Sequence, residues 1–342
     1  MPPSHSTRVV LAERPTAQVT PSTFRREVVP FDFKAGPGEV VVKVEYVSID
    51  PAMRGWLNDR RSYVEPVKIG EVMRALGLGE VVQAGEGSGL VPGDRVTGTL
   101  GWQEYVVLDS KAVRKVDVPR GAEFLDFLGP LSMTGFTAFV GLLDIGQLKA
   151  GETLVVSGAA GATGSIVCQI GKQKGAKVYA IAGSPEKCAW LEKELGVDKA
   201  LNYKSPTFRD DFKKHVGYFD VFFDNVGGEI LDFSLSRMKK NARIVFCGAI
   251  SDYNGKPKGL TGYLNLISQR ARIEGFIVFD HADRFPAALQ YFGEMLAEGS
   301  LKRKFHIVEG VENAPSAMNL LFTGGNTGKL VVKIAKDSKA KL

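Results

Sequence analysis

One glycine-rich turn constrains the fold of this chain more than any other feature of its sequence. A β-branched apolar run at 153–156 leads into Gly158, Gly161 and Gly164, and an amphipathic segment follows at 165–175. Glycine lacks a Cβ atom, so the backbone can turn sharply here and approach a pyrophosphate at the N-terminus of the following helix. Strand, glycine turn and helix in this order predict a dinucleotide site. The alternative is a tight turn with a purely structural role.

The rest of the chain falls into two parts that differ in their hydrophobic pattern. Before about Gly129, short β-type runs such as 38–50 and 90–109 are separated by glycine and proline turns, as in a small barrel or sandwich. After it, apolar strands alternate with amphipathic helices, which predicts a doubly wound parallel sheet. The β-type run KLVVKI at 329–334 is expected to return to the first part.

Element boundaries in the second part follow from the same pattern. It predicts strands at 218–228 and 242–251 with a helix at 231–240 between them. A last strand is predicted at 271–280, and a final amphipathic helix at 285–299.

Composition excludes several classes of protein. The 342 residues suggest about two domains at ~150 residues per domain. The net charge of +6 comes from basic residues spread along the chain without a recognition motif, so we expect no nucleic-acid partner. No apolar stretch approaches ~18 residues and the N-terminus has no secretory apolar core, so we expect no membrane span and no signal peptide. The three cysteines are few and dispersed, as in a reducing compartment.

The end of the second strand of the predicted dinucleotide domain indicates which cofactor binds. NAD-preferring sites place Asp or Glu about 20 residues after the glycine turn to bind the ribose, and this position is Gly183 here. Ser184 is the expected N-cap and Pro185 the first residue of the next helix, which puts Lys187 in its first turn. The helix dipole disfavours a cation there unless an anion binds, so the pattern favours the 2′-phosphate of NADP. The alternative is a lysine that simply faces water.

Residues that could ligate a metal are scarce. Residues 6–167 contain neither Cys nor His, and the four histidines of the chain lie at positions 5, 215, 281 and 306. The three cysteines, Cys168, Cys188 and Cys247, are too dispersed for a four-ligand zinc site. We therefore expect no metal.

Seven segments together resemble one family. They are VSIDPAMRGW (47–56), AAGATGSIVCQIGK (159–172), AGSPEKCAWL (182–191), NYK (202–204), FDNVGGEIL (223–231), CGAISDYN (247–254) and NTGKLVVKI (326–334). On these motifs the chain is similar to the medium-chain dehydrogenase/reductase superfamily. Within it, the chain resembles the zinc-independent group of prostaglandin reductases, leukotriene hydroxydehydrogenases, alkenal double-bond reductases and curcumin reductases. One departure is Ala52, where many members carry an aromatic residue, and it bears on the shape of the substrate pocket.

The resemblance implies an α/β fold with two domains. A GroES-like, β-barrel-type catalytic domain would span 1–128, completed by 304–342, and a Rossmann-type domain with a doubly wound parallel sheet would span 129–303. It also implies NADP(H) as cofactor and a homodimer formed through the last strand of the Rossmann-type domain. The expected NADP(H) contacts are Gly161, Ala162, Thr163, Gly164, Gly183, Lys187, Tyr203, Asn225, Cys247, Gly248, Ala249, Ile250, Ser251, Tyr253, Phe276, Ile277, Val278 and Asn326. Candidate substrate contacts, with packing as the alternative, are Met53, Trp56 and Tyr63.

Tyr253 is the candidate catalytic residue. It follows the strand predicted at 242–251, so it lies at the carboxyl edge of the sheet, where ligands bind in open α/β folds. The resemblance places the matching tyrosine beside the substrate carbonyl and the nicotinamide. A phenol, with an ordinary pKa near ~10, is protonated at neutral pH and can donate a hydrogen bond to a developing enolate oxygen. The alternative is a tyrosine that only packs on the cofactor, and protonation of the carbon stays open between this hydroxyl and water.

Together with the predicted NADP site and the expected lack of a metal, the resemblance implies an NADPH-dependent, metal-free reductase of the carbon–carbon double bond in α,β-unsaturated ketones and aldehydes. The alternatives are an NADPH quinone oxidoreductase and an NADPH-binding protein without turnover. We expect a cytoplasmic location. The C-terminal Ala340-Lys341-Leu342 resembles the Ser-Lys-Leu peroxisomal signal, which would apply in a eukaryote.

Overall fold

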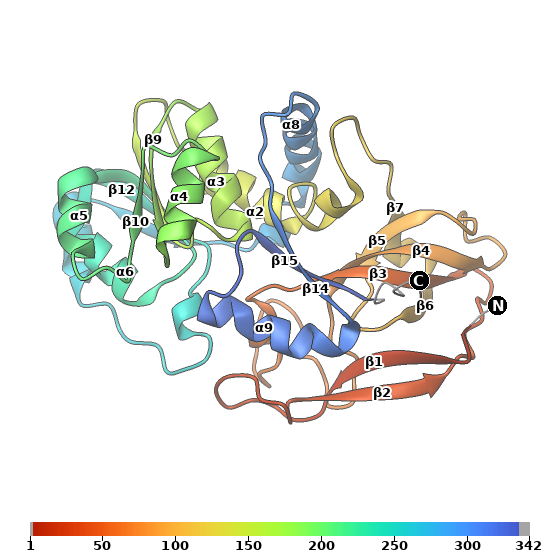
Figure 1. The fold of residues 1–342 in the computed structure, drawn as a ribbon. Coiled ribbons are helices and arrows are strands. Elements are labelled where there is room, and N and C mark those ends of the chain that lie inside the picture. Colours follow the sequence, from red (N-terminus) through yellow and green to blue (C-terminus); the bar gives the residue numbers. More distant parts are fainter. Residues whose placement is uncertain (1–2, 335–342) are drawn as a thin grey trace, which may run out of the picture. The chain divides into compact units, whose positions relative to one another are not determined.

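The computed structural model describes residues 3–334, which form two compact units (Figure 1). The first unit joins the chain up to Leu128 to the segment that begins at Phe305, and the second unit is Gly129–Lys304. Each unit has a hydrophobic core of its own. None of the helices in the described part of the chain is long and apolar enough to cross a membrane.

A six-stranded parallel sheet forms the centre of the second unit. Its strands are β8 (Thr153–Val156), β9 (Lys177–Ala182), β10 (Lys199–Asn202), β11 (Phe219–Asp224), β12 (Met238–Phe246) and β13 (Arg272–Gly275). They lie in the order β10-β9-β8-β11-β12-β13, and every adjacent pair is parallel. Relabelled along the chain, this is the 3-2-1-4-5-6 order of the doubly wound dinucleotide-binding fold, with its switch point between β8 and β11.

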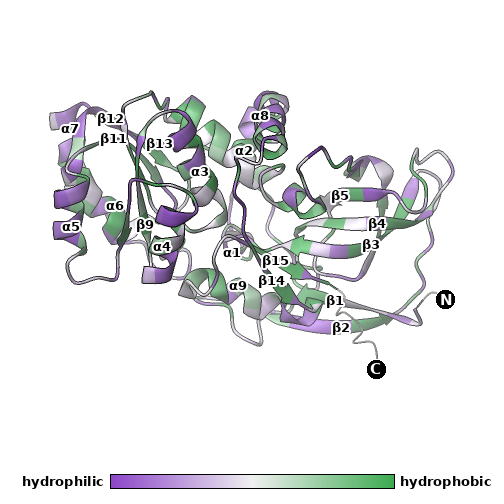
Figure 2. Ribbon diagram, turned by 45° about the horizontal axis from the view of Figure 1, so that its top comes forward, coloured by the Kyte–Doolittle hydropathy of each residue, from purple (hydrophilic) through white to green (hydrophobic). Residues whose placement is uncertain are grey.

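Helices cover both faces of this sheet. They are α2 (Met133–Val140), α3 (Ala162–Gln173), α4 (Pro185–Lys193), α5 (Phe208–His215), α6 (Gly228–Ser234), α7 (Asn265–Gln269) and α8 (Phe285–Ala297). Because side chains alternate along a strand, Val155 and Phe222 pack on one face with Phe212 of α5. On the other face, a Cβ atom on Gly171 of α3 would lie 2.6 Å from the Leu154 side chain, so the helix packs close to the sheet. The outer side of α5 is hydrophilic (Figure 2).

The predicted ends of β12 were wrong at both sides. The helix expected to reach residue 240 ends at Ser234, and β12 already begins at Met238, which pairs with Phe219 of β11. The polar run after Met238 forms an irregularity within β12, because the pairing with β11 passes from Phe219–Met238 directly to Val221–Arg243, and Asn241 has a positive φ of 63°. At the other end, β12 stops at Phe246 rather than 251, opposite Asp224, where its neighbour β11 also ends.

The predicted last strand is also shorter than expected. β13 ends at Gly275 instead of 280, and Gly275 pairs with Phe246, the final residue of β12. Beyond this point no neighbouring strand remains for residues 276–280 to pair with, so the apolar run leaves the sheet and enters a 3-10 turn at Val278–Arg284. β propensity alone does not keep a strand in a sheet when its partner has ended.

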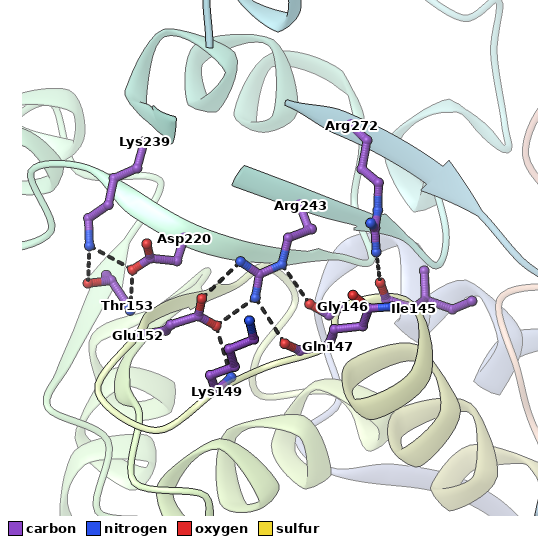
Figure 3. Close-up of polar contacts among 10 residues, drawn as sticks. All are labelled: Ile145, Gly146, Gln147, Lys149, Glu152, Thr153, Asp220, Lys239, Arg243 and Arg272. Carbon is purple, nitrogen blue, oxygen red and sulfur yellow. Dashed lines mark hydrogen bonds and ion pairs between the residues drawn. The ribbon is translucent and has the colours of Figure 1, made fainter. Parts of the chain in front are cut away.

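Ion pairs and hydrogen bonds fasten the amino edge of the sheet (Figure 3). The Arg243 guanidinium binds both carboxylate oxygens of Glu152, at 2.9 and 2.6 Å, and also donates to the carbonyls of Gly146 and Gln147. Lys239 lies 2.6 Å from Asp220, which also accepts the backbone N–H of Thr153. The elements of this edge are therefore cross-linked by side chains. In open α/β sheets, ligands bind at the opposite, carboxyl edge.

The first unit is built on a seven-stranded sheet and a separate two-stranded sheet, β1-β2. The strands are β1 (His5–Leu11), β2 (Phe24–Pro30), β3 (Glu39–Ser48), β4 (Leu76–Ala84), β5 (Arg95–Thr99), β6 (Tyr105–Asp109), β7 (Val113–Lys115), β14 (Phe305–Glu309) and β15 (Lys329–Lys333). Two helices of this unit are α1 (Met53–Trp56) and α9 (Ala314–Thr323). β15 lies antiparallel to β3, with Val331 opposite Ser48, so the predicted return of the 329–334 run to the first part of the chain is confirmed.

Candidate functional site

The glycine turn after β8 has the backbone geometry of an anion cradle. Gly158 has a positive φ of 56°, and Gly161 is the N-cap of α3, which has no side-chain cap. A Cβ atom on Gly164 would lie 2.5 Å from the carbonyl oxygen of Gly158 and 2.8 Å from the Cα of Ala159, so only glycine fits there. The first N–H groups of a helix have no partner within the helix and can face a bound anion. The predicted pyrophosphate contacts Ala162 and Thr163 lie in this first turn.

At the end of β9, the structure brings together the residues that are expected to determine the preference for NADP over NAD. Gly183 lies directly beside the Tyr203 ring, because a Cβ atom on Gly183 would lie 2.9 Å from a ring carbon. A carboxylate side chain at position 183 would therefore collide with Tyr203, unless that ring moved. The predicted start of α4 is confirmed, since Ser184 accepts the backbone N–H of Lys187 at 3.3 Å and Pro185 opens the helix.

Positive charge concentrates at the same place. Lys187 is half-buried, and its burial, followed by the charge of Lys204, lowers the pKa of its ammonium group. The Lys204 ammonium also lies 5.8 Å from the centre of the Tyr203 ring. Two cations close enough to interact, one of them beside an aromatic ring, form a site that suits a phosphate dianion. Lys204 was missed by the sequence prediction, although the quoted NYK segment contains it.

The ends of β11 and β12 bring together a second group of predicted cofactor contacts. The carbonyl of Asp224 accepts the N–H groups of Cys247 at 2.9 Å and Gly248 at 3.1 Å. Asn225 donates its side-chain amide to the carbonyl of Ser157, the residue after β8, at 2.7 Å. Three adjacent strand ends are thus joined at the carboxyl edge, around the switch point of the sheet.

Tyr253 lies in this second group. It directly follows a 3-10 turn at Ile250–Asp252 and is half-buried. Its hydroxyl oxygen accepts the backbone N–H of Ala249 at 3.2 Å. A Cβ atom on Gly248 would lie 3.1 Å from the same oxygen, so the phenol packs against the backbone of the predicted cofactor segment. The hydroxyl is therefore held at a fixed place on the carboxyl edge.

The remaining predicted contacts are more scattered. Phe276, Ile277 and Val278 are half-buried in the segment that leaves β13. Asn326 belongs to the first unit, where its side-chain amide donates to the carbonyl of Gly328 at 3.1 Å. In the described residues 3–334, no group of three or more His, Cys, Asp or Glu side chains is arranged to hold a metal ion.

The three candidate substrate residues also belong to the first unit and differ in exposure. Met53 is 0% exposed and packs in the core, so its side chain fills the interior rather than facing a ligand. The Trp56 indole N–H donates to the Tyr63 hydroxyl at 3.2 Å, and Tyr63 is 47% exposed. Trp56 and Tyr63 therefore present a joined aromatic surface in the segment that follows Ala52.

Comparison with known families matches both halves of the chain. Residues 7–116 match a family described as the N-terminal domain of oxidoreductases. Residues 162–294 match a family described as zinc-binding dehydrogenases.

Individual relatives match over nearly the full length. The chain is 44% identical to a Bacillus subtilis (strain 168) protein named NADP-dependent oxidoreductase YfmJ, over 97% of this chain and 98% of that protein. It is 38% identical to the NADPH-dependent curcumin reductase of Escherichia coli (strain K12), over 96% and 97% of the two chains. Among solved structures, CurA from Vibrio vulnificus in complex with NADPH superposes with a TM-score of 0.89 at 36% identity, covering 96% of this chain and 99% of that one.

Proposed function

Because the chain belongs to the prostaglandin reductase, alkenal reductase and curcumin reductase group of the medium-chain dehydrogenases/reductases, we propose that it uses NADPH to reduce the carbon–carbon double bond of α,β-unsaturated ketones and aldehydes. NADP-dependent oxidoreduction is the activity that the names of these relatives share. The double bond as the reacting group is the finer part of the proposal. It is supported by relatives named curcumin reductase and 2-alkenal reductase, and by the position of Tyr253.

The residues at the carboxyl edge of the second unit fit NADPH. The glycine turn from Gly158 to Gly164 would hold the pyrophosphate, since side chains there would fill the cradle. Lys187, Tyr203 and Lys204 would hold the 2′-phosphate, and the segments at Asn225 and Cys247–Ser251 would receive the nicotinamide half. When bound, NADPH supplies the hydride that is added to the β-carbon of the substrate.

The single observation that carries the proposed chemistry is the placement of the Tyr253 hydroxyl. Hydride addition to an enone moves negative charge onto the carbonyl oxygen, and a fixed donor near that oxygen stabilises the charge. Tyr253 is anchored through Ala249 within the predicted nicotinamide segment, so it is our candidate for this donor. Protonation of the α-carbon is assigned to either this hydroxyl or water.

Turnover of a small substrate panel tests the proposal. NADPH oxidation would be followed with an unsaturated ketone, an unsaturated aldehyde and a quinone, with product analysis for the saturated carbonyl compound. We expect the enone and enal to be reduced at the double bond with a higher kcat/KM than the quinone. Exclusive turnover of the quinone would make the protein a quinone oxidoreductase. Retained NADPH binding without oxidation across the panel would make it a binding protein.

The proposal extends to a homodimer. β13 is the outer strand of its sheet, and its free edge offers unpaired backbone groups to a second copy. The apolar residues after it include Phe279, which is 50% exposed and would be covered by such pairing. Light scattering at micromolar concentration is expected to give twice the mass of the chain. A monomeric mass would refute the dimer.

The remaining assignments are also proposals. The first unit would be the GroES-like catalytic domain and the second unit the NADP-binding domain. Trp56 and Tyr63 are proposed as substrate contacts and Asn326 as a cofactor contact. We propose a cytoplasmic location. The C-terminal tripeptide that resembles a peroxisomal signal lies outside the described residues.

A further inference from the structure

A buried carboxylate lies at the meeting point of the predicted nicotinamide contacts. Asp224, the last residue of β11, is 0% exposed. Its carboxylate accepts the Ser157 hydroxyl at 2.5 Å, the N–H of Val226 at 3.0 Å and the N–H of Gly227 at 3.0 and 3.2 Å. Burial raises the pKa of this carboxyl group to about 6, so the group is mostly ionised at neutral pH.

These bonds determine the shape of the loop after β11, residues 225–228, which we call the Asn225 loop. Its two glycines, Gly227 and Gly228, have positive φ angles of 71° and 56°. The Asp224 side chain collects the N–H groups that this turn aims inward, as short polar side chains do in tight turns. Ser157 adds a second support, since its oxygen also accepts the N–H of Asn225 at 2.9 Å.

The Asn225 loop in turn holds the segment after β12, residues 247–253, which we call the Cys247 loop. The carbonyl of Val226 accepts both the N–H and the hydroxyl of Ser251, at 3.1 and 2.7 Å. The two loops also pack without spare room, because a Cβ atom on Gly227 would lie 3.0 Å from the Cβ of Ala249. A shift of the Asn225 loop would therefore be passed on to the Cys247 loop and to Tyr253, which is bonded to Ala249.

A buried carboxylate is poor evidence for a role in stability, since losing its hydration offsets much of what its hydrogen bonds contribute. Asp220, four residues earlier on β11, shows the contrast. It also bonds to β8, through the N–H of Thr153, but it does so at the amino edge of the sheet and next to Lys239 (Figure 3). The donors to Asp224 belong instead to the loops that carry the predicted cofactor contacts.

We propose that Asp224 and Ser157 are positioning residues that hold the Asn225 loop and the Cys247 loop in the conformation that receives the nicotinamide half of NADPH. This inference rests on the proposed function, because it presumes that NADPH binds at this edge. Neither side chain needs to touch the cofactor. Each acts through the backbone groups that it binds.

The test compares the binding of NADPH with that of 2′,5′-ADP, which contains only the adenosine half with its 2′- and 5′-phosphates. Asp224→Asn places an amide N–H₂ among N–H donors and should displace the Asn225 loop. We expect its dissociation constant for NADPH to rise by about tenfold or more, while that for 2′,5′-ADP stays within about twofold of wild type. Ser157→Ala keeps the carboxylate and should show a smaller rise of the same kind. The matched control, Asp220→Asn, should lower the melting temperature without changing either dissociation constant.

A pH series adds a readout that a purely structural role would not change. The titratable groups that face Asp224 are Asp252, whose charge also raises the Asp224 pKa, and Cys247, whose thiol pKa is raised to about 12 by its burial. Protonation of Asp224 replaces an acceptor with a donor, so wild-type affinity for NADPH relative to 2′,5′-ADP should fall below about pH 6. The 5′-phosphate titrates as a monoester in 2′,5′-ADP but not within the diphosphate of NADPH, so this fall is measured against Asp224→Asn at each pH. That variant keeps the titration of both ligands and lacks that of Asp224.

Several outcomes would overturn the inference. The first is that Asp224→Asn and Ser157→Ala bind both ligands with the dissociation constants of wild type. The second is that the affinity for NADPH and for 2′,5′-ADP falls equally, which would indicate general damage to the domain. If Asp224→Asn does not fold, Ser157→Ala decides the question by the same comparison. If wild type itself binds 2′,5′-ADP but not NADPH, or binds neither, the proposed function fails and this inference fails with it.

Discussion

Tyr253→Phe is expected to lower kcat for an enone by about 10-fold to 1,000-fold, with little change in NADPH affinity. The substitution keeps the aromatic ring and removes the hydroxyl, so it deletes the donor to the developing enolate oxygen. It also leaves the N–H of Ala249 without its acceptor, which is 3.2 Å away in the wild type. Steady-state kinetics with a saturating enone, together with a fluorescence titration of NADPH, measures both effects.

Tyr263→Phe is the matched control for this experiment. Tyr263 lies ten positions further along the chain, is 55% exposed and is not among the predicted site residues. Removal of the Tyr263 hydroxyl should leave both kcat and KM for the enone near the wild-type values. If Tyr253→Phe turns over the enone within a factor of about two of wild type, the hydroxyl has no role in polarising the carbonyl.

Cofactor preference is the second large effect. We expect kcat/KM with NADPH to exceed that with NADH by about tenfold to a hundredfold, because charge-assisted bonds to the 2′-phosphate have no counterpart in NADH. Gly183 offers nothing to a ribose hydroxyl, and the Tyr203 ring lies where a carboxylate side chain would otherwise extend. Lys187→Ala should remove most of the preference, by raising KM for NADPH and leaving that for NADH unchanged.

Two further lysines make this prediction specific. Lys193→Ala removes an exposed lysine from the far end of the same helix, α4, and should leave the preference intact. Lys204→Ala should remove a smaller share than Lys187→Ala, because Lys204 is exposed to solvent and its charge is better screened. Equal efficiency of the wild type with NADPH and NADH would contradict the assignment of this site.

The features that could be predicted from sequence are those set by residues close together in the chain. The fold class is confirmed, because the pattern of strand, glycine turn and helix repeats along residues 153–240 and specifies a parallel doubly wound sheet. The start of α4 at Ser184 and Pro185 is confirmed for the same reason, since a helix cap depends on a few neighbouring residues. The absence of a carboxylate at position 183 is likewise a property of the sequence alone.

What only the tertiary structure decided depends on groups far apart in the chain. β13 ends at Gly275 because its neighbour β12 ends opposite it, and Met53 is buried because the core of the first unit surrounds it. Lys204 reaches the site of Lys187 because β10 lies beside β9 in the sheet. Asp224 matters because donors from the end of β8 and from its own loop converge on it. Periodicity and motif spacing describe contacts within one element, whereas the end of a strand and the environment of a charge are set by whatever packs against them.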